Sequence, residues 1–435
     1  MTGPAKPGPD ATEALLERLQ RESFRYFAHE TDAASGLVPD TTVVGSPASI
    51  AAMGLALTAY PVAVARGFTT RDEACGITLA TLRFLWNSPQ GPEHDAAGHH
   101  GFYYHFLDMR TGRRTWNCEL STIDTALLMA GVLAAAASFD GASSEETEIR
   151  SLAEALYERV DWPWALNGGL TLTMGWKPES GFLRHRWTGY DEALLLYALG
   201  LGSPTFPLPA ASYAAWCATY RWKRLYGREY LHAGPLFIHQ LSHVWIDFRE
   251  IQDAFMREKG MDYFENSRRA TLLQQEYAIR NPRGFAGYGA LSWGLTASDG
   301  PGPASFGAGR SVRRFAGYLA RGIPFGPDDG TLAPWAAVAS LPFAPEVVLP
   351  TIEALIHERP AIQSAYGLLG SFNPSFPSVD GKGWVASSYF GLNEGPIVLM
   401  IENHRSGLIW RLMRGSPHLV SGLRRAGFRG GWLER

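Results

Sequence analysis

Helical segments follow one another along nearly the whole chain, and this succession limits the possible folds more than any other feature. Several segments open on a capping signal, in which Ser, Thr or Asp stands three residues before an acid. We expect helices near residues 11–27, 50–65, 70–85, 121–138, 143–160, 188–201, 210–226, 262–280, 333–341, 345–358, 391–403 and 407–414. Since only short strands interrupt them, a parallel α/β sheet is excluded.

The expected strands are short and lie between the helices. Residues 99–114 predict a β-hairpin around a turn at residues 110–113, residues 168–173 predict a strand, and residues 228–238 predict a second hairpin. Residues 284–303 predict a polar, glycine-rich loop. Loops of this length in a compact domain usually have a function. Helical hairpins of similar length repeated around a ring indicate an all-α (α/α)6 toroid, or barrel, with short β-hairpins in its loops. In that fold one end of the inner helices forms a concave site.

Composition narrows the function classes. No linker divides the 435 residues, so we expect a flexible tail at residues 1–10 and a single catalytic domain at residues 11–435. A formal net charge of −3 with interspersed charges disfavours nucleic acid as a partner. The longest apolar run, residues 125–139, is too short to span a bilayer, and the first ten residues lack the apolar core of a signal peptide. We therefore expect a cytoplasmic protein without a membrane partner.

Residues 187–197 place two adjacent carboxylates at the mouth of an apolar helix. Thr188 and Asp191 have the spacing of a capping box, which leaves Glu192 free for another role. Trp187 and Tyr190 flank the expected opening, and an apolar surround raises the pKa of a carboxyl, as a proton donor beside a sugar requires. The alternative is that both acids are first-turn residues favoured by the helix dipole.

Residues 116–124 repeat this pattern of an aromatic residue, an acid, a cap and an apolar helix. Ser121 and Asp124 form a second capping box. Asp124 is thus either a structural acid of the first turn or a site residue, and Glu119, just outside the helix, faces the same expected cavity. Trp116 lies beside these polar groups, as sugar-stacking aromatics do, although a large core is the other explanation for the 14 Trp residues.

His239 and His243 are four residues apart, a spacing that places both on one face of a helix. This spacing suits a metal, but the Glu of an HExxH motif is missing. We therefore interpret the pair as a polar face that hydrogen-bonds hydroxyls or packs against loops, and we expect no metal. The sequence also lacks a phosphate-binding glycine loop and a GxSxG elbow.

Several longer strings resemble one bacterial family, the glucoamylase-like family that contains the β-1,2-glucanases. They are FIHQ at residues 237–240, SH at 242–243, WIDFR at 245–249, DYFENSRRA at 262–270, WGLTASDGP at 293–301, DDGT at 328–331 and MIEN at 400–403. The resemblance runs from about residue 13 to residue 433. It implies an (α/α)6 barrel, hydrolysis of β-linked glucans without a cofactor, and a general acid at Glu192, which ends the motif Tyr190-Asp191-Glu192.

The chain departs from that family at two places. The family usually carries Gly-Ile-Asp-Gln-Gly-Pro where this chain has Asn393 and Glu394 at the third and fourth positions, and Asp-Ala-Phe-Asn where it has Gly370 and ends on Asn373. Hydrolysis of a glycoside needs a second carboxyl, and the toroid resemblance favours inversion of the anomer. The candidates for that partner of Glu192 are Glu394, Glu119 and Asp124.

The sequence thus predicts a glycoside hydrolase or transglycosylase acting on β-linked glucans or glucooligosaccharides, most consistent with the β-1,2-linked, sophorose type. The alternative is a glycan-binding or sensing protein that has lost the second acid. The predicted substrate-binding residues are Trp116, Trp176, Trp187, Tyr190, Asp191, His239, His243, Asn373 and Asn393.

Overall fold

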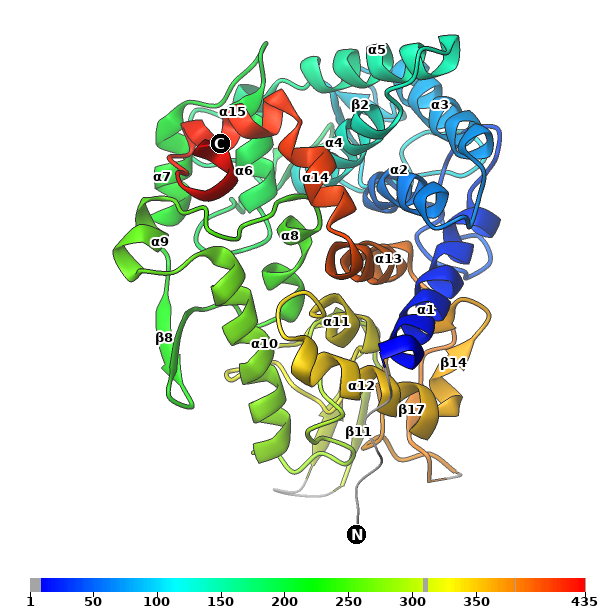
Figure 1. Ribbon diagram of the computed structural model, residues 1–435, viewed down its shortest axis with the longest axis vertical. Helices are drawn as coiled ribbons and strands as arrows, with labels where there is room; N and C mark the ends of the chain where they lie inside the picture. The colour runs from blue at the N-terminus through cyan, green and yellow to red at the C-terminus, as the bar shows by residue number, and fades with distance from the viewer. Residues whose placement is uncertain (1–8, 308–311, 380, 435) are drawn as a thin grey trace.

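The computed structural model describes residues 9–307, 312–379 and 381–434, which form two layers of helices (Figure 1). The inner helices are buried along most of their length. They are α2 (Ile50–Ala65), α4 (Thr122–Ser138), α6 (Leu194–Gly202), α8 (Leu241–Trp245), α11 (Pro334–Ala339) and α13 (Gly391–Arg405). The predicted (α/α)6 barrel of the all-α class is confirmed.

The outer helices cover the inner layer with one apolar face each. They are α1 (Pro9–Glu30), α3 (Arg71–Asn87), α5 (Ser144–Glu158), α10 (Tyr263–Arg280), α12 (Pro345–Glu358) and α15 (Pro417–Arg425). Figure 1 shows α1 beside α13, and α15 packs against α6. In α5 the buried residues Ile149, Ala153 and Leu156 recur every three to four positions, which gives a single apolar stripe.

Two glycines let the inner helices α2 and α4 pack closely. A Cβ atom on Gly131 of α4 would lie 2.0 Å from the carbonyl oxygen of Gly54 in α2. A Cβ atom on Gly54 would lie 2.3 Å from the carbonyl oxygen of Leu127. Because backbone occupies the space that either side chain would need, these positions require glycine.

Short antiparallel strands decorate the loops. The pairs that lead into inner helices are β1 (Ala48–Ser49) with β4 (Phe106–Leu107), and β5 (Leu120–Ser121) with β6 (Gly175–Lys177) and β7 (Gly181–Phe182). The others are β2 (Gly98–His99) with β3 (Phe102–Tyr103), β8 (Trp222–Leu225) with β9 (Arg228–Leu231), β10 (Ala297–Ser298) with β13 (Leu319–Ala320), β11 (Ala304–Phe306) with β12 (Arg313–Phe315), β14 (Gln363–Ser364) with β15 (Gly367–Leu368), and β16 (Phe372–Asn373) with β17 (Trp384–Val385). Pairing of Ser49 with Phe106 and of Ser121 with Gly175 fixes where α2 and α4 begin.

Most predicted helix starts are confirmed. Ser49, Thr70, Ser143 and Asp262 each accept a hydrogen bond from a backbone N–H of the first turn of their helix. At Thr70 the capping box is complete, since Glu73 also binds the backbone N–H of Thr70. The remaining helices are α7 (Ala210–Cys217), α9 (Ala254–Lys259) and α14 (Leu408–Arg414).

Three local predictions are wrong. The helix expected at residues 210–226 ends at Cys217, because the chain enters β8, whose hairpin turns at Tyr226 and Gly227 with φ of 47° and 82°. A turn with positive φ at both residues matches the twist of paired strands. The hairpin expected at residues 228–238 therefore lies at residues 222–231. Residues 168–173 form no strand, since the backbone N–H of Thr173 donates to Ala165 and the strand begins at Gly175.

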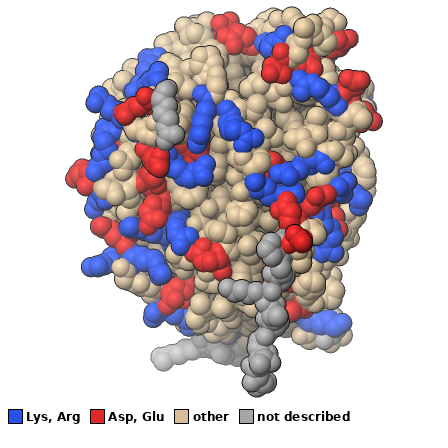
Figure 2. Space-filling view, in the orientation of Figure 1, with Lys and Arg blue, Asp and Glu red and all other residues tan. Residues whose placement is uncertain are grey.

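At the N-terminus, residues 1–8 of the expected tail lie outside the described residues, whereas residues 9 and 10 already belong to α1. Residues 99–114 contain two turns: β2 and β3 join through His100 and Gly101, and a bridge between Leu107 and Arg114 closes the predicted turn. Across residues 9–307, 312–379 and 381–434, no helix combines the length and the apolar character needed to cross a membrane. Figure 2 shows basic and acidic side chains intermixed over the visible face.

Candidate active site

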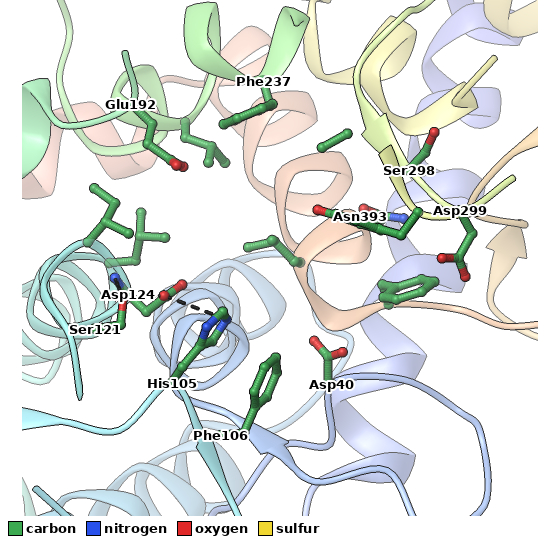
Figure 3. A pocket seen from close by; sticks show the side chains of 18 of the residues that line it. Asp40, His105, Phe106, Ser121, Asp124, Glu192, Phe237, Ser298, Asp299 and Asn393 are labelled. Carbon is green, nitrogen blue, oxygen red and sulfur yellow. Dashed lines mark hydrogen bonds and ion pairs between the residues drawn. The ribbon is translucent and has the colours of Figure 1, made fainter. Parts of the chain in front are cut away.

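A cavity of about 510 Å³ opens at the end of the barrel where the inner helices begin. Its walls come from the loops before α2, α4, α6 and α8 and from the first residues of α11 and α13. The polar and ionisable side chains that line it include Asp40, His105, Glu119, Ser121, Asp124, Glu192, Ser298, Asp299, Tyr318 and Asn393 (Figure 3). Within the described residues, no group of His, Cys, Asp and Glu has the arrangement of a metal site.

The chain reaches Glu192 through a turn and not through a capped helix. Helix α6 begins at Leu194, and its N-cap residue Ala193 makes no side-chain capping bond, so the capping box predicted for Thr188 and Asp191 is wrong. The Asp191 carboxylate instead accepts hydrogen bonds from the backbone N–H of Ala193 at 3.0 Å and from Trp216 Nε1 at 2.9 Å. Glu192 therefore precedes the helix, and Figure 3 shows its carboxyl pointing into the cavity.

Glu192 is held in its protonated form. Enclosure by the cavity walls raises its pKa to about 8, and the negative charges of Asp124 and Asp191 act in the same direction. The charge of His105 opposes this rise without cancelling it. At neutral pH most molecules therefore carry a transferable proton on Glu192.

Of the residues next to Glu192 in sequence, some line the cavity and others lie behind its wall. Trp187 lines the cavity and donates from Nε1 to Thr122 Oγ1 at 3.0 Å. Tyr190 is absent from the cavity wall and packs against Tyr263, with ring centroids 5.9 Å apart. Asp191 also lies behind the wall, and burial raises its pKa to about 7. Of the predicted flanking aromatics, only Trp187 contacts the cavity.

The mouth of α4 carries a chain of three charged groups. His105 Nδ1 lies 3.0 Å from Glu119 Oε1, and its Nε2 lies 3.6 Å from Asp124 Oδ2. Burial opposes the charged imidazole, but Asp124, Glu119 and Asp40 outweigh it and raise the pKa of His105 to about 9. The hydrogen bond from His105 holds the pKa of Glu119 below its usual value. The imidazolium thus binds both carboxylates.

Ser121 fixes Asp124 at the start of α4. Its hydroxyl accepts the backbone N–H of Asp124 at 3.2 Å and donates to Asp124 Oδ2 at 2.5 Å. The predicted cap is confirmed, and the same carboxylate lines the cavity. Asp124 is therefore both a first-turn acid and a cavity residue, so the two readings of the sequence do not exclude each other.

Three cavity residues with a carboxyl or imidazole side chain, Asp40, His105 and Asp299, were not among the predicted site residues. Asp40 and Asp299 stand on the wall near Asn393, across the cavity from Glu192 (Figure 3). Asp299 lies in the string at residues 293–301 that carries the family resemblance, which was a usable signal. Asp40 and His105 belong to irregular or very short extended segments, where no spacing marks a site.

Glu394 does not line the cavity, although it was a predicted catalytic residue. Its side chain is fully buried against neighbouring elements, and burial raises its pKa well above the usual value against a smaller opposing effect of the Ser23 hydroxyl. The helical rotation of α13 explains this difference, because successive residues point in different directions and Asn393 takes the cavity side.

The two histidines also lie outside the cavity wall, because the chain breaks at Gln240 between a 3₁₀ turn (Leu236–His239) and α8. Burial lowers the pKa of each to about 3. His239 approaches Asn266, and His243 Nε2 lies 2.9 Å from Ser267 Oγ. Their predicted contact with substrate hydroxyls has no support in this geometry.

Three other predicted substrate contacts differ in position. Asn373 is buried and donates to the carbonyl of Asp329 and to Thr331 Oγ1, both at 3.0 Å. Trp176 packs against His99 at 5.1 Å between ring centroids, away from the cavity wall. Trp116 is 66% exposed and lies against Phe106, a cavity residue. Trp116 is the most exposed of the three, and its ring packs against a residue of the cavity wall.

Comparison with known proteins decides the family. Residues 184–417 match the Glycoamylase family model, described as "Putative glucoamylase". The chain belongs to this family. The resemblance predicted from the sequence is therefore confirmed.

Individual relatives span the described barrel. A similar curated protein is the exo β-1,2-glucooligosaccharide sophorohydrolase (non-reducing end) of Parabacteroides distasonis, 27% identical over 96% of this chain; the chain spans 58% of that relative's length. A Bacteroides uniformis structure described as a "putative glucoamylase" is 30% identical, with a TM-score of 0.86 over 99% of this chain and 100% of the other. The endo-β-1,2-glucanase of Chitinophaga pinensis, solved with sophorotriose and glucose, is 25% identical, with a TM-score of 0.85 over 97% and 99%.

Proposed function

We propose that the protein is a glycoside hydrolase of β-1,2-linked glucooligosaccharides, with Glu192 as its general acid. The observation that carries this proposal is a protonated carboxyl, with a pKa of about 8, that faces a cavity also lined by His-bound carboxylates. A pair of carboxyl groups in different protonation states is what glycoside hydrolysis requires.

The chemistry follows from the two charge states. Glu192 donates its proton to the glycosidic oxygen as the bond from that oxygen to the anomeric carbon breaks. Positive charge then develops on the sugar ring, and the Asp124 carboxyl group beside His105 stabilises it. Water supplies the new oxygen at the anomeric carbon.

The cavity suits a sugar in shape as well as in charge. Trp187 and Phe106 offer apolar faces, Asn393 offers an amide to hydroxyl groups, and Trp116 extends the aromatic surface beyond the cavity edge. The β-1,2 linkage is proposed because the named substrates of the Parabacteroides and Chitinophaga relatives carry it.

Product analysis tests the proposal. The purified protein is incubated with β-1,2-linked di- to pentasaccharides and with matched β-1,3, β-1,4 and β-1,6 series, and NMR follows both the products and the anomer first formed. We expect cleavage of the β-1,2 series and none by Glu192→Gln prepared in parallel, which controls for a contaminating glycosidase.

The proposal fails if no β-linked series is cleaved at high protein concentration. Calorimetry on the same samples then separates the alternatives. Tight binding with the oligosaccharide recovered intact would identify a glycan-binding protein instead.

A further inference from the structure

The cavity wall at the start of α13 has no carboxylate of its own. Asn393 lines the cavity but its amide cannot accept a proton from water, and Gly370 beside it has no side chain. The two positions are neighbours, since a Cβ atom on Gly370 would lie 3.1 Å from Asn393 Nδ2. A base opposite Glu192 must therefore come from another segment.

The loop that carries Asp40 is fastened to this same wall. The carbonyl oxygen of Asp40 accepts the backbone N–H of Gly391 at 3.0 Å, and Thr41 forms a β-bridge with Phe390. On the other side, the backbone N–H of Asp40 donates to Pro47 at 2.7 Å. These bonds hold the Asp40 backbone at the start of α13, two positions from Asn393.

The carboxyl of Asp40 is held in place by its backbone but is not engaged by a partner. No hydrogen bond or ion pair of its carboxylate oxygens occurs with any of the described residues, whereas Glu119 and Asp124 are both bound to His105. Figure 3 shows Asp40 directed into the cavity from the side opposite Glu192. A carboxyl placed in this way can bind a water molecule and then accept a proton from it.

The charges that face Asp40 leave it ionised while Glu192 is protonated. Burial raises the pKa of Asp40 to about 6, His105 lowers it, and Asp124 and Asp299 raise it. The ring of Tyr318 also faces these carboxylates. Between about pH 6 and pH 8, Asp40 is charged and Glu192 is neutral.

Asp299 is the other carboxylate on this side, and its surroundings differ. Burial raises the pKa of the Asp299 carboxyl and Arg321 lowers it, whereas the carboxyl of Asp40 interacts with His105 and Asp124 as well as with Asp299. Asp40 is therefore nearer to the groups that surround the reacting bond, and Asp299 is nearer to the rim formed by β10 and β13.

We propose that Asp40 is the catalytic base that activates water in this protein. This assignment rests on the proposed hydrolase function. As Asp40 removes a proton from the water, the water oxygen bonds to the anomeric carbon, the glycosidic carbon–oxygen bond breaks, and Glu192 protonates the departing oxygen. Asp40 then releases its new proton to solvent and Glu192 takes up one proton from solvent, which restores both groups, so each turnover consumes one water and no other reactant.

Asp40→Asn and Asp40→Ala test the assignment with sophorotriose as substrate and Asp299→Asn as the matched control. We expect both Asp40 variants to lose at least ~100-fold in kcat, as for a missing general base. Asp299→Asn should lose less than about tenfold, because it leaves the base intact. Binding of sophorotriose by calorimetry and an unchanged melting temperature show that each variant is folded.

Azide separates a lost base from a damaged site. Azide needs no proton removed, so with Asp40→Ala it should attack the anomeric carbon, while Glu192 protonates the leaving oxygen, and give a glycosyl azide of inverted configuration. The pH profile of kcat/KM should fall below about pH 6 in the wild type and lose that limb in Asp40→Asn.

Hydrolysis by Asp40→Asn within tenfold of an active wild type overturns the assignment and leaves the proposed function standing. A folded Asp40→Ala variant that binds sophorotriose but forms no glycosyl azide also overturns it. A wild type that cleaves nothing overturns the proposed function and this inference together.

Discussion

The mouths of α4 and α6 share a sequence pattern, but their acidic side chains differ: a histidine binds those at α4, whereas Glu192 at α6 is protonated. In both, a Trp and an acid precede a helix that is apolar on nearly all sides. At α4, Ser121 caps the helix and His105 binds the carboxylates of Glu119 and Asp124. At α6 there is no side-chain cap, and Glu192 stands before the first turn, where none of the cationic side chains in the described part of the chain contacts its carboxyl.

This difference shows that an acid beside an apolar helix is not by itself a proton donor. Enclosure raises the pKa of a carboxyl, but a bound imidazolium reverses the effect, as the lowered pKa of Glu119 demonstrates. The protonation state is decided by partners that come from distant segments of the chain. Each prediction below changes one side of this comparison.

The largest effect is expected for Glu192→Gln. The amide keeps the size of the side chain but has no transferable proton, so kcat for a β-1,2-linked trisaccharide should fall by at least ~100-fold. Glu394→Gln is the control, since it changes another enclosed Glu near a helix start that does not face the cavity. Equal losses in both variants would show that enclosure, and not position on the cavity, explains the effect.

A loss of about tenfold in kcat is expected for Asp124→Asn, because the charge that stabilises the sugar cation is removed. The same change removes a negative charge that raises the pKa of Glu192, so the basic limb of the kcat/KM profile should move to lower pH. If Asp124 were only a structural cap, Asp124→Asn would lower the melting temperature and would not move the basic limb of the kcat/KM profile. Steady-state kinetics across the pH range distinguishes these results.

Trp116→Ala should have a smaller effect that depends on substrate length. The exposed ring sits at φ of 56°, in the left-handed region that is uncommon for a bulky residue, and extends the aromatic surface of Phe106. Loss of one aromatic contact, about 1 kcal/mol, should raise KM about fivefold for a pentasaccharide and leave kcat unchanged. An equal change for the disaccharide would place Trp116 at the reacting sugar instead.

The smallest effect is expected in stability. A carboxyl whose pKa is raised in the folded state contributes stability that is present below its unfolded pKa, near 4.5, and is lost as the pH rises through about 8. Melting temperatures of the wild type and Glu192→Gln should therefore agree near pH 5, and the variant should melt higher near pH 9. A constant difference at all pH values would mean that Glu192 does not titrate in this range.

The local signals in the sequence were sufficient for most of the barrel. Ser49, Thr70, Ser143 and Asp262 begin helices because each cap bonds to a backbone group a few residues away. The same reasoning failed at Thr188, where Trp216, which is remote in sequence, donates to Asp191 and favours a turn. Periodicity likewise could not show that the helix from Ala210 ends at Cys217, because the hairpin that follows it depends on a primed turn.

Site residues could be predicted from the sequence where they lie at the start of an inner helix. Those on loops and short strands were not predicted. Glu119, Asp124, Glu192 and Asn393 line the cavity as expected. Glu394 differs from Asn393 by one residue, a rotation about the helix axis that needs the packing of α13 to be known. His105, Asp40 and Asp299 reach the cavity from irregular loops and strands of two residues, whose direction depends on contacts across the barrel.

The protonation of Glu192 tests the central claim most directly, and infrared difference spectroscopy of the protein without ligand measures it. The spectrum of the wild type minus that of Glu192→Gln isolates this one carboxyl from the other buried acids. We predict a protonated carboxyl band at pH 6.5 that converts to a carboxylate band with a midpoint near pH 8. A carboxylate band already complete at pH 6 would contradict the account, because Glu192 would then resemble Glu119 and could not serve as the acid.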